Sequence, residues 1–302
     1  MKVHDEHEFG RIGRRAALIC AALGLITAAL LCGDVCVAQK KEAIRADWLA
    51  LDDANIERLL PQLERQNPLT LVALEKIFDG VNVEDVGFGG RTFRAWQGGG
   101  YTSLSITGFV FNDKMAYYTI AVNCSSSWPK ASRVVIEAWK RISQLEFVEG
   151  QYGITNERTF PDVVGDYKRA VARELGEMTA VTVPPDLKDA YEVLTALGES
   201  LVLSEDVCGY AAVTPRGKAA IDAIVAAGRF DLLSNILKGH NAGGRVYAAL
   251  ALTAMQRKGA ELPADVQRTM RIVRALDMDL KTCSGCIGGF MKTERILAEW
   301  RR

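Results

Sequence analysis

Histidine is scarce in this sequence: three of 302 residues are histidine, and only His240 lies beyond residue 7. A zinc site built on several histidines is therefore excluded for most of the chain, and an all-cysteine site would need a second close cysteine pair that the sequence lacks. An excess of charge of either sign is also missing, since 37 Lys and Arg balance 37 Asp and Glu. Without a basic field we expect no nucleic-acid partner, and we expect no metal ion or other cofactor.

Short catalytic and nucleotide-binding motifs are missing as well. The glycine clusters at residues 87–90 and 98–100 contain neither a P-loop nor a dinucleotide fingerprint, so we interpret them as turns. No Gly-x-Ser-x-Gly elbow accompanies His240, which lies in the glycine-rich stretch of residues 239–244. His240 is a candidate polar site: it is either a general base or a ligand, or else a polar loop residue or helix cap. We assign no catalytic residue.

The first 38 residues have the pattern of a secretory signal peptide. Three arginines at positions 11, 14 and 15 precede an apolar run over residues 16–32, and the small-residue stretch that follows offers a cleavage site after Ala38. The apolar run is close to the length of a spanning helix, so an uncleaved N-terminal anchor stays open. A lipoprotein and a twin-arginine substrate fit less well, because Leu31, Val35 and the alanines at 16 and 17 depart from those patterns.

Cysteine usage agrees with export. Three cysteines, Cys20, Cys32 and Cys36, fall in the leader, and four remain beyond it: Cys124, Cys208, Cys283 and Cys286. An even number in an exported chain predicts disulfide bonds, and four cysteines allow three pairings. We favour Cys208–Cys286, which would close a loop of roughly 75 residues and stabilise the fold by about 4 kcal/mol through chain entropy.

The motif Cys283-Ser284-Gly285-Cys286 offers a second interpretation, a redox-active CxxC site. A redox CxxC needs its first cysteine at a helix N-terminus, where the dipole lowers the pKa of the thiol. The residues that follow, Ile287-Gly288-Gly289, are a poor helix start, and no βαβ pattern precedes the motif. The motif therefore favours a structural disulfide over a redox site.

Residues 39–183 have the pattern of a small sheet flanked by helices. Apolar spacing predicts helices over residues 39–66 and 71–78, the second ending at Gly80, and over 129–144 and 161–178. Between them, three segments rich in aromatic and β-branched residues predict a three-stranded antiparallel meander, over 91–96, 101–111 and 115–124. The turn at residues 112–114 joins the last two as a hairpin. Neighbouring strand residues face opposite sides, so Tyr117 and Tyr118 point away from each other.

After the boundary at Thr182-Val183-Pro184-Pro185 the pattern predicts only helices. They are separated by single glycines at 228, 239 and 259, a rhythm typical of antiparallel helical hairpins. The run GRFDLLSNILKGHNAGGRVYAALAL gives the segment Thr214–Asp277 a resemblance to a HEAT-type helical repeat, over about a fifth of the chain. The resemblance implies stacked helices and a surface for a partner, and it implies no reaction.

The sequence therefore predicts an α+β protein: a small antiparallel β-meander packed by helices, followed by an all-α region of HEAT-like helical hairpins. The predicted segments are a signal peptide (1–38), an α+β domain (39–183) and an α-helical domain (184–302). We expect an exported, periplasmic or secreted protein that binds another envelope protein without catalysis. It would touch a membrane only if the N-terminal segment stays uncleaved. The alternative is an envelope hydrolase or thiol–disulfide protein that uses His240 or the pair Cys283 and Cys286.

Overall fold

The computed structural model describes residues 44–64, 70–209 and 211–300, and the described residues from Arg45 onward form one compact unit. The predicted signal peptide, its cleavage site after Ala38 and the three leader cysteines lie outside the described residues. Within the described part, no helix is both long enough and apolar enough to cross a membrane. The domain boundary at residues 183 and 184 stays a prediction.

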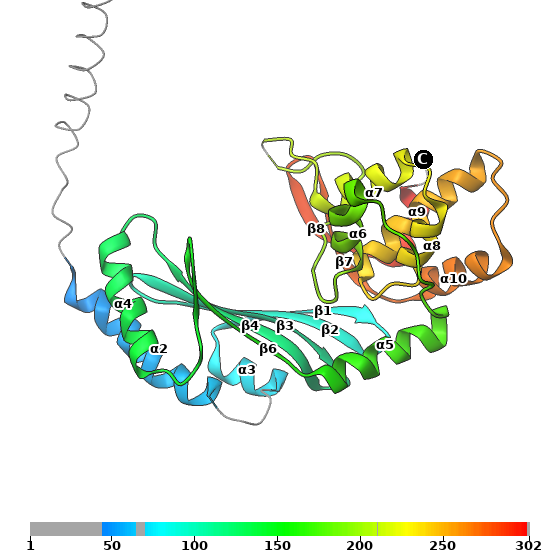
Figure 1. Cartoon of the computed structure of the whole chain (residues 1–302). Helices are drawn as coiled ribbons and strands as arrows, with labels where there is room; N and C mark the ends of the chain where they lie inside the picture. The colour runs from blue at the N-terminus through cyan, green and yellow to red at the C-terminus, as the bar shows by residue number, and fades with distance from the viewer. Residues whose placement is uncertain (1–43, 65–69, 210, 301–302) are drawn as a thin grey trace, which may run out of the picture. The chain divides into compact units, whose positions relative to one another are not determined.

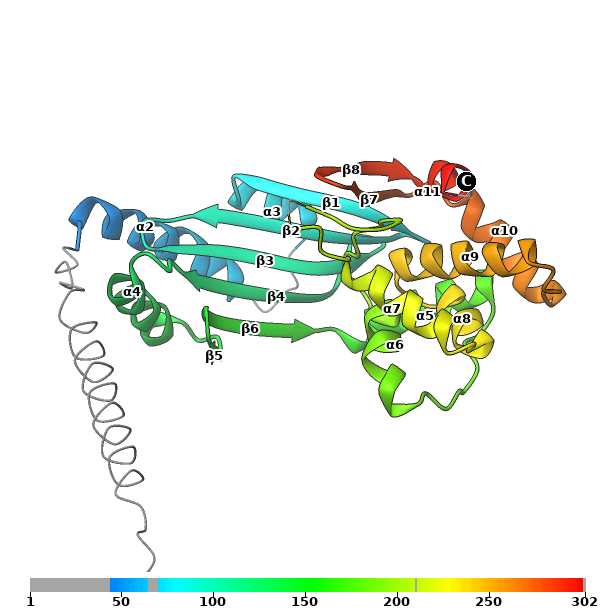
Figure 2. The same cartoon turned by 90° about the horizontal axis from the view of Figure 1, so that it is seen from above.

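A six-stranded antiparallel sheet with the order β1-β2-β3-β4-β6-β5 is the centre of this unit (Figure 1, Figure 2). Its strands are β1 (Gly80–Gly87), β2 (Gly90–Gly98), β3 (Thr102–Phe111), β4 (Lys114–Cys124), β5 (Val148–Gly150) and β6 (Gly153–Thr159). Strands β1 to β4 form a meander, which confirms the antiparallel meander of the predicted α+β class. The sheet has more strands than the three that we expected: β1 and β5 form its edges, and these two strands and β6, which lies between β4 and β5, carry few apolar residues. Gly80 begins β1 and does not end a helix.

Two tight turns fix the register of the meander. Asn112 and Asp113 adopt φ angles of 46° and 64°, the left-handed conformation that a two-residue hairpin turn requires. This confirms the predicted hairpin between β3 and β4. The β1–β2 turn has positive φ at Gly87, Phe88 and Gly89. Phe88 is the unusual member, because a bulky residue rarely adopts a φ of 58°.

Three helices cover one face of the sheet: α2 (Ala46–Leu63), α3 (Leu71–Ile77) and α4 (Pro129–Ile142) (Figure 1). All three were expected from apolar spacing. Val135 and Trp139 of α4 are buried against the strands, together with Ile120 of β4. Asp52 of α2 is also buried, and its carboxylate accepts hydrogen bonds from the backbone and side chain around Tyr101 and Thr102. The helix is therefore tied to the turn that precedes β3.

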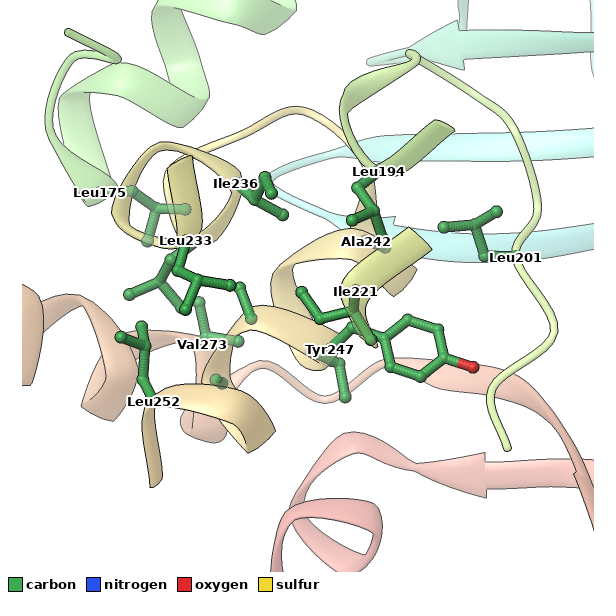
Figure 3. Packing of buried hydrophobic residues seen from close by; sticks show 14 of the residues in the cluster. Leu175, Leu194, Leu201, Ile221, Leu233, Ile236, Ala242, Tyr247, Leu252 and Val273 are labelled. Atoms are coloured by element: carbon green, nitrogen blue, oxygen red, sulfur yellow. The ribbon is translucent and has the colours of Figure 1, made fainter. Parts of the chain in front are cut away.

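A second core joins one end of the sheet to the remaining helices. These are α5 (Pro161–Leu175), α6 (Lys188–Thr195), α7 (Arg216–Ala226), α8 (Phe230–Leu237), α9 (Ala242–Arg257), α10 (Ala264–Ala275) and α11 (Thr293–Glu299), with a 3-10 turn at Pro185–Leu187. Figure 3 shows side chains from these helices converging, among them Ile221, Leu233, Leu252 and Val273. Tyr117 packs against this second core and Tyr118 belongs to the first, which confirms that the two tyrosines face opposite sides of the sheet.

Residues after 184 are not all helical. Strands β7 (Asp279–Ser284) and β8 (Ile287–Lys292) form an antiparallel hairpin between α10 and α11. The expectation of helices alone is therefore wrong here. The reason is physical: Gly288 and Gly289 disfavour a helix, and the two-residue turn Gly285-Cys286, with Gly285 at a φ of 55°, suits a hairpin. The HEAT-type resemblance of residues 214–277 stays a prediction.

Candidate functional site

The β7–β8 hairpin is joined to the segment of residues 201–208 by a disulfide bond and a short backbone ladder. Cys208 and Cys283 form the disulfide, with their Cα atoms 5.8 Å apart. Leu203 donates its N–H to the Lys281 carbonyl at 2.8 Å, and Cys283 donates to the Leu203 carbonyl at 2.9 Å. This segment therefore runs parallel to β7 and is fixed at both ends.

The pairing that we favoured, Cys208 with Cys286, is not the one in the structure. Cys283 lies inside β7, where its side chain faces the neighbouring segment, whereas Cys286 lies in the turn and is exposed. Cys124 is the other free cysteine of the described chain, half-buried at the end of β4. Burial raises the pKa of the Cys124 thiol, so at neutral pH it is a weak nucleophile.

An apolar groove lies beside residues 201–208, the segment that the disulfide joins to β7. It has a volume of about 320 Å³, and its floor is formed by Ile221 and Val225 of α7, Leu250, Ala254 and Met255 of α9, and Trp300. We call it the α7–α9 groove. The volume is at the lower end of the range for binding cavities, and aromatic residues and methionine are enriched at protein interfaces. The groove is thus suited to receive one or two apolar side chains.

Tyr247 of α9 fixes one wall of the groove. Its hydroxyl donates to the Val202 carbonyl at 3.1 Å and accepts from the Ser204 N–H at 2.9 Å. In Figure 3 the hydroxyl points away from the packed leucines, toward the chain that carries Leu201. Burial raises the pKa of Tyr247 to about 12, so the hydroxyl stays protonated and both hydrogen bonds persist at physiological pH.

The rim of the groove carries charges of both signs. Lys218 and Asp222 form an ion pair one turn apart on α7. Glu205, on the wall segment, and Lys258, just after α9, form no ion pair within the described residues. Glu205 lies near the Tyr247 end of the groove, and Lys258 follows Tyr247 by three helical turns, roughly 16 Å along α9. Among the described charges that lack an ion-pair partner, the groove therefore has a carboxylate near Tyr247 and an ammonium group toward its other end.

His240 lies in the loop between α8 and α9, away from this groove. Its ring centroid is 6.4 Å from that of Tyr167, and its backbone carbonyl accepts a hydrogen bond from the Tyr167 hydroxyl at 3.4 Å. Burial lowers the pKa of His240 to about 4, with further contributions from the positive charges of Lys168 and Arg245. A histidine with this pKa is a weak base near pH 7, which does not favour a hydrolase that depends on it.

We expect stability to fall in acid through His240. Because its pKa is lowered in the fold, the unfolded chain takes up a proton near pH 6.5 while the folded chain does so only near pH 4. The stabilisation is complete above pH 6.5 and is lost as the pH falls toward 4. Allowing for partial solvent screening, the loss is about 2 kcal/mol. Urea unfolding at pH 7 and pH 4 should show this loss in the wild type and a smaller one in His240→Asn; equal losses would contradict the assignment.

A larger depression between α2 and α4, about 650 Å³, is less suited to binding. Half of the residues that line it are charged, including Arg133, Glu137 and Arg141. No aromatic side chain lines it, in contrast to Tyr247 and Trp300 of the α7–α9 groove. Among the described residues no group of His, Cys, Asp and Glu could hold a metal ion.

Comparison with known proteins gives no match to a family model, and no curated protein or solved structure shows significant similarity to the chain.

The structure brings together three of the cysteines singled out from sequence, Cys208, Cys283 and Cys286, and places Cys124 and His240 elsewhere. The groove itself was not predicted from the sequence, because its lining residues come from α7, α9, residues 204 and 205 and Trp300, which lie far apart along the chain. One feature of the sequence could have indicated the groove. Tyr247, Leu250 and Ala254 recur at helical spacing on α9, and this helix is apolar on more of its circumference than a single contact with the core requires.

Proposed function

We propose that this chain is a non-catalytic protein-binding protein that acts outside the cytoplasm, and that its α7–α9 groove receives a segment of a partner protein. The observation that carries the proposal is an apolar groove with an aromatic wall and opposite charges at its ends. A disulfide bond holds the adjoining wall, which is compatible with an exported protein. The pattern of the first 38 residues supports export as well.

The charges favour a particular partner segment. A basic residue would pair with Glu205, a bulky apolar side chain would lie over Leu250 and Ala254, and an acidic residue would pair with Lys258. Apolar burial would supply most of the affinity, since ion pairs at an exposed rim contribute little and mainly set orientation. The partner is therefore a protein with an exposed segment of the order basic, apolar, acidic.

The test is selection from a random peptide display library on residues 39–302. We expect enrichment of peptides with this order of residues, and at least tenfold weaker binding of an enriched peptide to Ala254→Trp, because the indole would fill the groove. Ala219→Trp, at an exposed position of α7 outside the groove, is the matched control and should bind normally.

Two results would contradict the proposed function. One is a selection that enriches no peptide above the bare support. The other is an enriched peptide that binds Ala254→Trp as well as the wild type. Mass spectrometry of the native protein tests the proposed location separately: a mature N-terminus at Gln39 is expected, and a cytosolic protein that begins at Met1 would exclude export.

A further inference from the structure

Three cysteines meet at the tip of the β7–β8 hairpin. The backbone of Cys208 is bridged to Gly285 in the hairpin turn, and Gly209 donates its N–H to the Gly285 carbonyl at 2.7 Å. Cys283 precedes Gly285 by two residues, and Cys286 follows it directly. The disulfide joins Cys208 to Cys283, so a free thiol lies next to an existing disulfide.

We propose that Cys208, Cys283 and Cys286 form a thiol–disulfide exchange centre. The thiolate of Cys286 attacks the sulfur of Cys283, and a new Cys283–Cys286 bond forms as the Cys208–Cys283 bond breaks. The electron pair of the broken bond stays on the Cys208 sulfur, which takes up the proton that Cys286 released. One disulfide and one thiol are present before and after, so the step needs no oxidant or reductant.

The local structure permits this exchange. The thiolate is the attacking species in disulfide exchange. Cys286 is exposed, so hydroxide in the solvent can reach its thiol and remove the proton. Apart from the backbone hydrogen bond from Gly209, the turn has open space around it: a Cβ atom added at Gly285 or Gly289 would meet nothing within 4 Å, and Ile287 is 78% exposed. A Cys283–Cys286 disulfide needs Cα atoms closer than about 7 Å, and a turn that contains a glycine and has open space around it can adjust to that distance.

The exchange would release one wall of the α7–α9 groove. Ser204 and Glu205 lie on the segment that the Cys208–Cys283 bond fastens to the hairpin. After exchange this segment keeps its hydrogen bonds to Lys281 and Tyr247 and loses its covalent tie. The coupling to binding rests on the proposed function, whereas the exchange itself does not.

Disulfide mapping tests the exchange directly. A protein of residues 39–302 with Cys124→Ser, in which Cys208, Cys283 and Cys286 are the cysteines left, is incubated at pH 8.5 without added reductant, quenched in acid, alkylated and digested. We expect at least a tenth of the molecules to carry Cys283–Cys286 with alkylated Cys208, and Cys286→Ser to retain only Cys208–Cys283. Exclusive recovery of Cys208–Cys283, or a Cys208–Cys286 product, would overturn the proposal.

Peptide binding then tests the coupling. The affinity of the peptide enriched on the wild type is compared between Cys286→Ser, in which the wall stays fastened, and Cys208→Ser, in which it is released. We expect at least a fivefold weaker affinity for Cys208→Ser. Equal affinities would overturn the coupling and leave the exchange intact. If neither form binds any selected peptide, the proposed function fails, while the disulfide map still decides the exchange.

Discussion

Arg245→Ala is expected to lower the free energy of unfolding by about 4 kcal/mol. Arg245 has no exposed surface, and its guanidinium donates to the carbonyls of Gly239, at 3.0 Å, and Val86. It also lies 5.2 Å from the centre of the Phe88 ring. The side chain therefore ties α9 to the β1–β2 turn. Truncation would leave a cavity and two buried carbonyls without donors.

Two variants separate volume from hydrogen bonding at this position. Arg245→Met keeps most of the volume and removes the donors, so it should cost about half as much as the alanine variant. Arg268→Ala, at an exposed position of α10, should change stability by less than about 0.5 kcal/mol. Denaturant unfolding of the three variants gives the comparison. An Arg245→Ala variant as stable as Arg268→Ala would show that the guanidinium is not buried.

Gly244→Ala is expected to lower the free energy of unfolding by about 3 kcal/mol. A Cβ atom at Gly244 of α9 would overlap the backbone carbonyl of Leu194 in α6, and a backbone atom cannot move aside as a side chain can. This loss outweighs the gain of about 1 kcal/mol that alanine brings to a helix interior. Thermal or denaturant unfolding measures the net effect.

Gly165→Ala is the matched control. Gly165 also lies inside a helix, α5, but the nearest atom to its added Cβ would be the end of the flexible Arg169 side chain, at 3.3 Å. The helix-propensity gain should prevail here, and the variant should be as stable as the wild type or up to about 1 kcal/mol more stable. Equal effects at Gly165 and Gly244 would refute the close approach of α6 and α9.

Short-range sequence patterns predict much of the fold. Val135 and Trp139 recur at helical spacing and predict α4, and Asn112-Asp113 between two aromatic-rich segments predicts the β3–β4 hairpin. These elements have one apolar face and clear end signals, so the local sequence is sufficient to predict them. Their burial against the sheet follows from the same spacing.

The edge strands and the second hairpin could not be predicted in this way. β1 contains Asn82, Glu84 and Asp85, because an edge strand is partly solvated and needs few apolar residues. β8 is exposed over most of its length, and β7 also pairs with the distant segment of residues 201–208. The predicted partner of Cys208 was wrong for the same reason. The position of β7 beside residues 201–208 brings Cys283, and not Cys286, into a disulfide with Cys208.

The positions of Arg245 and Trp300 depend on long-range packing, which local sequence patterns do not reveal. Arg245 lies in an alanine-rich helix and looks like any surface arginine until the fold encloses it. Trp300 closes a groove whose other residues lie on α7 and α9. Each of these positions has an ordinary local pattern, and only the packing of distant elements buries Arg245 beside the β1–β2 turn and places Trp300 beside α7 and α9.

The most direct test of the account is methyl NMR of the protein with labelled methionines, titrated with the peptide that selection enriches. Met255 lies in the α7–α9 groove, and Met115 is buried in the sheet core as an internal reference. If the peptide binds in the groove, the Met255 signal shifts saturably with peptide while the Met115 signal does not move. Saturable binding that leaves Met255 unchanged would contradict it.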